Sequence, residues 1–158
     1  MITTRFTIPP HLAEYLNGKF NGCGTGPISL PDTSDLYHLL WGLMSRRPAG
    51  VSPIDEGNVF LQLPDRRAGK DPQYYNYISG RAAKLFADRV NALFIAELHQ
   101  RMDDTHISTH PICFTDVVHL MLSEYDINSI SEDALIKNYR RWRDRTMKRT
   151  KRRAYSRK

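Results

Sequence analysis

Residues 78–102 read ISGRAAKLFADRVNALFIAELHQRM and predict a long amphipathic helix. Their apolar side chains recur at every third or fourth position, as at Phe86, Phe94 and Leu98, and the charged side chains lie between them. Because an α-helix turns once in about 3.6 residues, this spacing places the apolar side chains on one face. The polar stretch 103–111 is expected to end the helix. We expect the rest of the chain to pack against this face.

The N-terminal half predicts short strands and two short helices. The expected elements are strands at 3–8, 28–30 and 59–63, a helix from Pro10 to about Gly22, and a helix capped by Asp32 or Ser34 that reaches Met44. Two or three short strands are not stable alone in water, so the sheet should pack on the 79–102 helix. The predicted fold class is α+β, with a small antiparallel sheet followed by three helices.

The C-terminal part predicts two helices joined by a turn. Residues 115–125 carry one apolar face, and a second helix is expected from about 131 to at least 147. Ser129 and Glu132 have the spacing of a capping box at the start of the second helix. Two helices joined by a short turn at 126–130 form a helix-turn-helix-like pair, in which the second helix reaches DNA.

The second helix of this pair has one anchoring face and one cationic face. Leu135, Tyr139 and Trp142 fall at i, i+4 and i+7, so they form a narrow stripe that we expect to dock on the 115–125 helix. Basic side chains lie near the opposite side. Tyr139 and Trp142 also allow a second interpretation, as stacking platforms for unpaired bases.

Charge is distributed unevenly along the chain. Residues 137–158 contain 12 of the 23 Lys and Arg residues and one acidic residue, a net charge of +11, whereas residues 1–136 have a net charge of −5. A basic end on a mildly acidic protein is typical of an arm that contacts a polyanion, and the alternative is a solubilising tail. We therefore expect a single domain at 1–146 and a basic, disordered tail at 147–158 that orders on a phosphate backbone.

The candidate nucleic-acid-binding residues are the cations of this end. They are Lys137, Arg140, Arg141, Arg143, Arg145, Lys148, Arg149, Lys151, Arg152 and Arg153. The start of the last helix is acidic, with Glu132 and Asp133, and carboxylates are repelled by phosphate. The helix is therefore expected to lie along the backbone or to enter a groove with its C-terminal part, as basic-region helices do.

We expect a binding protein rather than an enzyme, without cofactor or bound metal. His106, His110 and Cys113 have a spacing compatible with zinc ligands, but no second cysteine pair accompanies them, so we interpret them as loop residues. No serine or cysteine has a recognisable nucleophile context, and Tyr74, Tyr75 and Tyr77 are expected to pack between the sheet and the helix. The sequence has no long apolar run and only two cysteines, which favours an intracellular protein without membrane contact.

The sequence Leu135-Ile-Lys-Asn-Tyr-Arg-Arg-Trp-Arg143, after a helix that ends in Glu-Tyr-Asp-Ile, resembles the C-terminal end of small uncharacterised proteins of phages and mobile elements of gut bacteria. The similarity covers about the last 45 residues. It implies a mobile-element setting, with the protein in the cytoplasm of a bacterial host or in a virion. It also favours DNA over RNA and carries no catalytic residue. The leading hypothesis is a DNA-binding regulator or accessory protein, with a homo-oligomer or a phage protein as partner. The alternatives are a phage structural or packaging protein and an RNA-binding protein.

Overall fold

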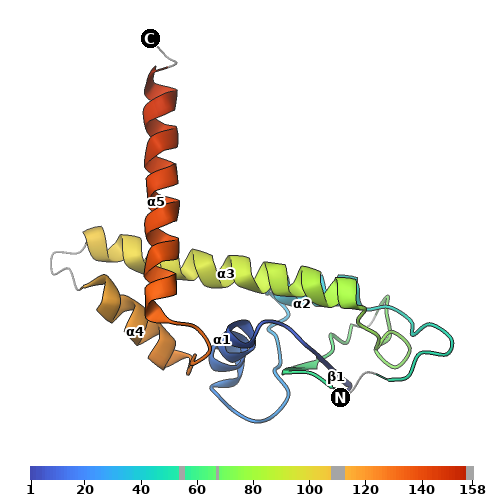
Figure 1. The fold of residues 1–158 in the computed structure, drawn as a ribbon. Coiled ribbons are helices and arrows are strands. Elements are labelled where there is room, and N and C mark those ends of the chain that lie inside the picture. Colours follow the sequence, from blue (N-terminus) through green and yellow to red (C-terminus); the bar gives the residue numbers. More distant parts are fainter. Residues whose placement is uncertain (54–55, 67, 108–112, 156–158) are drawn as a thin grey trace.

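The protein has the predicted α+β fold, with a small antiparallel sheet and a helical C-terminal half (Figure 1). The computed structural model describes residues 1–53, 56–66, 68–107 and 113–155. In these ranges the order is β1 (Thr3–Phe6), α1 (Pro10–Asn21), α2 (Asp35–Leu43), β2 (Val59–Gln62), α3 (Gly80–Ile107), α4 (Phe114–Glu124) and α5 (Glu132–Tyr155). None of the helices in the described ranges has an apolar stretch long enough to cross a bilayer.

The sheet consists of β1 and β2, which pair antiparallel with Thr4 opposite Leu61. The expected third strand at 28–30 is wrong, because only Ile28 forms a bridge, to Leu61. The prolines at 27 and 31 flank this segment, and proline lacks the backbone N–H that a strand needs to continue its pairing.

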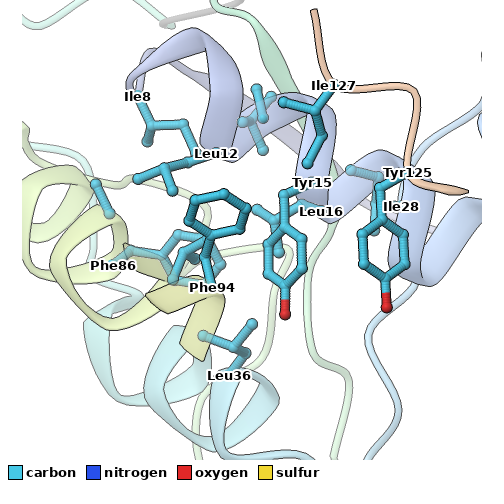
Figure 2. Close-up of a cluster of buried hydrophobic side chains, with 14 of the residues drawn as sticks. Ile8, Leu12, Tyr15, Leu16, Ile28, Leu36, Phe86, Phe94, Tyr125 and Ile127 are labelled. Atoms are coloured by element: carbon cyan, nitrogen blue, oxygen red, sulfur yellow. The ribbon is translucent and has the colours of Figure 1, made fainter. Parts of the chain in front are cut away.

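Helix α3 is the central helix of the fold, and the other elements pack against it. Phe86, Val90, Phe94 and Leu98 are fully buried along one face, as the sequence predicted. The sheet contacts this face through Phe6, whose ring meets Phe86 edge-on at 5.5 Å between centroids. The cluster around Phe86 and Phe94 joins residues from α1, α2 and the turn before α5 (Figure 2).

Helix α3 continues past Met102 to Ile107, so the predicted end at 103 is wrong. The polar residues after Met102 have partners that are compatible with helix: Asp103 accepts a hydrogen bond from the Tyr139 hydroxyl, and the Thr105 hydroxyl donates to the Arg101 carbonyl. The first of these partners lies far along the chain and is not visible in the local sequence.

The helix boundaries elsewhere follow the predicted signals with one exception. Ser34 caps α2 by accepting from the Tyr37 amide, and Gly22 ends α1 in the left-handed conformation, with φ of 55°. At α5 the cap is Ser131, whose hydroxyl accepts from the Ala134 amide. The expected capping box at Ser129 is therefore wrong, because the Ser129 hydroxyl donates to Glu14 instead.

Helix α5 runs without interruption to Tyr155 and extends beyond every other element (Figure 1). Residues 147–155, which the sequence assigned to a tail, continue α5 as helix, and residues 156–158 lie outside the described residues. Arg, Lys and Met have high helix propensity. The hydroxyls of Thr146 and Thr150 also donate to carbonyls one turn earlier, at Trp142 and Thr146.

Candidate nucleic-acid interface

The first half of α5 is anchored in the core. Leu135 and Tyr139 are buried, and the Tyr139 ring contacts Phe114 of α4 at 5.3 Å. The Tyr139 hydroxyl donates to Asp103 of α3 over 2.7 Å. Burial, together with this hydrogen bond, raises the pKa of Tyr139 to about 12, so the phenol stays neutral and keeps its donor proton at physiological pH. These two residues dock α5 on α4, as predicted, and also on α3.

Trp142 packs differently from the prediction. Its ring stacks on His99 of α3, with centroids 4.3 Å apart and an interplanar angle of 29°, and 37% of its surface stays exposed. His99 is itself buried and hydrogen-bonded through Nε2 to Asn138 of α5 over 2.9 Å. The predicted partner, the 115–125 helix, is thus not the surface on which the Trp142 ring stacks. The imidazole of His99 covers one face of the Trp142 indole. That face is therefore not accessible to the base that the stacking-platform interpretation requires.

The turn before α5 is held by a carboxylate that sequence reasoning missed. Glu14 of α1 accepts hydrogen bonds from the backbone amides of Asn128 and Ser129, each over 3.0 Å, and from the Ser129 hydroxyl over 2.5 Å. No local pattern joins Glu14 to a turn more than a hundred residues away. These bonds fix the path of the chain into α5 and therefore the direction in which the helix leaves the protein.

Beyond Trp142, residues 144–155 form what we call the projecting segment. Every residue from Asp144 to Arg153 is exposed. The segment contains six basic residues and one acidic residue. Its basic members are Arg145, Lys148, Arg149, Lys151, Arg152 and Arg153. Packing against the core does not explain a helix whose residues are exposed on every side, and the net charge of the segment is strongly positive.

The remaining predicted residues occupy the anchored half of α5 and differ from one another. Arg140 and Arg141 are exposed on the side away from the buried stripe. Lys137 is also exposed, but it forms an ion pair with Asp133 one turn earlier, over 2.6 Å. Arg143 is half-buried beside the Tyr139 hydroxyl, whose pKa it lowers in part. Lys137 and Arg143 therefore have protein partners within the anchored half of α5.

The zinc-ligand candidates His106, His110 and Cys113 lie only partly within the described residues. Cys113 is exposed at the start of α4, whereas His110 and the His106 side chain lie outside the described residues. Across the parts of the chain that the structure describes, no three His, Cys, Asp or Glu residues lie close enough to share a metal ion.

No protein-family model, curated protein or solved structure matches this chain. The similarity of residues 135–143 to mobile-element proteins stays a prediction. Function is therefore argued from the position, exposure and charge of α5.

Proposed function

We propose that this protein binds nucleic acid through α5. The observation that carries the proposal is the projecting segment: a helix fixed to the core by Tyr139 and Trp142 continues into solvent with six cations and one carboxylate. Lys and Arg that neutralise phosphates release condensed counterions, which gives affinity without regard to sequence.

The charge of the rest of the protein confines this contact to one end. Residues 1–136 have a net charge of −5, so taken as a whole this part of the protein does not attract a polyanion. The acidic part is left available for a second protein, as a regulator or accessory factor would need. Within this proposal the nucleic acid meets the protein at α5 alone.

The test is a titration of the full chain with a labelled oligonucleotide at several salt concentrations. If about half of the 12 C-terminal cations contact phosphate, log K should fall with log salt with a slope of about −4 to −6 on duplex DNA. A variant with Arg140, Arg149, Lys151 and Arg153 changed to Gln should lower the magnitude of this slope by about 3 to 4.

The matched control changes four exposed cations outside α5 to Gln, so that the net charge is the same in both variants. Suitable positions are Arg46, Arg47, Arg81 and Lys84. The proposal predicts that this control keeps the affinity and the salt slope of the unchanged protein. Equal losses in the two variants would indicate non-specific charge attraction and would refute α5 as the binding element.

A further inference from the structure

The cations of α5 are distributed over a wide sector of the helix. At about 100° per residue, Arg141, Arg145 and Lys148 fall at i, i+4 and i+7 and form a central row, roughly 120° around the helix from the buried stripe. A first flanking row, Arg149 and Arg153, lies on one side of it, and a second flanking row, Arg140 and Lys151, lies on the other. Together the three rows span roughly 200° of the helix circumference, about twice the apolar stripe with which a helix faces one surface.

Cations over a sector this wide can contact anionic groups on two sides of the helix at once. A single strand or one phosphate backbone would meet one side of α5 and leave a flanking row in solvent. The major groove of B-form DNA is about 12 Å wide, admits an α-helix about 10 Å across, and has a phosphate row along each edge. The major groove of duplex RNA is too narrow for a helix. The 12 residues of the projecting segment are about 18 Å long, enough to follow such a groove for part of a turn.

On this basis we infer that the projecting segment of α5 lies in the major groove of duplex DNA. The inference rests on the proposed nucleic-acid function and specifies its ligand. The two flanking rows contact the phosphates of the two strands, and the central row faces the base edges, where Arg can donate two hydrogen bonds to guanine.

The same placement accounts for the acidic start of α5. Glu132 accepts from His119 of α4 over 2.8 Å, and Asp133 pairs with Lys137. Both carboxylates lie at the anchored end, at least 12 residues or about 18 Å along the axis from Arg145. The groove therefore receives the C-terminal half of the helix, where six cations outnumber one carboxylate, Asp144.

The experiment measures binding of the full chain to duplex DNA, duplex RNA and single-stranded DNA of one sequence at two salt concentrations, and to a set of duplex DNAs of different sequence. We expect duplex DNA to bind at least tenfold more tightly than either competitor. Changing the first flanking row (R149Q/R153Q) or the second (R140Q/K151Q) should lower the magnitude of the salt slope by about 2 and weaken all DNA sequences by the same factor. Changing the central row (R145Q/K148Q) should instead reduce the preference among sequences. The double variant R81Q/K84Q on α3 is the matched control and should change nothing.

Two results would overturn the inference and leave the proposed function standing. One is duplex RNA or single-stranded DNA that binds as tightly as duplex DNA. The other is a salt slope that responds to only one of the two flanking rows, which is the result expected for a helix on a single backbone. Absence of salt-dependent binding to all three nucleic acids would refute the proposed function, and the inference with it. Thermal unfolding of each variant checks that the substitutions leave the fold intact.

Discussion

Glu97 of α3 joins three helices through one carboxylate. It accepts hydrogen bonds from Tyr15 of α1 over 2.7 Å, from Tyr125 at the end of α4 over 2.6 Å, and from Lys19 and Arg101. The hydroxyls of Tyr15 and Tyr125 point the same way (Figure 2). Burial opposes the ionisation of Glu97, but the four hydrogen bonds outweigh it and lower its pKa from 4.5 to about 2.

This carboxylate predicts an acid-dependent loss of stability. Because the pKa in the folded state lies below the ordinary value of 4.5, ionised Glu97 stabilises the fold at pH above about 4.5, and this contribution is lost as the pH falls toward 2. The contribution is on the order of 3 kcal/mol. Urea unfolding at a series of pH values should show a steeper acid loss for the unchanged protein than for Glu97→Gln. The control is Asp88→Asn, an exposed acid on the same helix, and a Glu97→Gln curve that parallels the unchanged one would contradict the prediction.

Trp142 is a second residue whose environment predicts a measurable effect. Trp142→Ala should cost about 2 kcal/mol of unfolding free energy, less than a fully buried aromatic, because 37% of the side chain is exposed. A double-mutant cycle with His99→Ala should give a coupling of about 1 kcal/mol from the ring stack. Met147→Ala, in the projecting segment, should change stability by less than about 0.5 kcal/mol. A coupling near zero would show that the stack contributes nothing.

At the scale of whole elements, the sequence predicts the helices well and their long-range partners poorly. The apolar periodicity of α3, α4 and the start of α5 depends on local spacing, and the predicted stripes are buried except at Trp142, which is 37% exposed. The extension of α3 past Met102 depends on the hydrogen bond from Tyr139 to Asp103. Ser129 does not cap α5, because its hydroxyl donates to Glu14. Such contacts join residues tens of positions apart, and no local pattern specifies them.

The projecting segment carries its own source of instability, and this gives an element-scale prediction. Arg141 and Arg145, Arg145 and Arg149, and Arg149 and Arg153 are like charges at i, i+4, each pair costing about 0.2–0.5 kcal/mol in water. Salt or a polyanion screens this repulsion. The circular-dichroism signal of helix at 222 nm should therefore increase between about 20 mM and 500 mM salt in the full chain. The variant R145Q/R149Q should already be more helical at low salt, and a signal independent of salt in both proteins would contradict the argument.

At the scale of the whole molecule, the sequence predicts the charge of the candidate site but not the arrangement of its side chains. The list of cations followed from composition, since 12 of 23 basic residues lie in the last 22 positions. Composition does not show that Lys137 and Arg143 contact protein groups, or that α5 continues as helix to Tyr155. Both depend on how α5 packs on the core and extends beyond it. The direction of α5 depends on three separate elements, through Glu14 of α1, His99 of α3 and Phe114 of α4.

Because these contacts all lie before residue 143, two truncations should behave in opposite ways. A chain that ends at Thr146 keeps Leu135, Tyr139 and Trp142, so its melting temperature should stay within about 2 °C of the full chain while its formal net charge changes from +6 to −1. A chain that ends at Ser131 loses the whole of α5 and leaves Val118, Met121 and Phe114 without the helix that covers them, so it should unfold without a cooperative transition. Calorimetry measures both. Equal stability of the two truncated chains would mean that α5 is not part of the folded domain, and the fixed direction of the basic helix, on which groove binding depends, would then be lost.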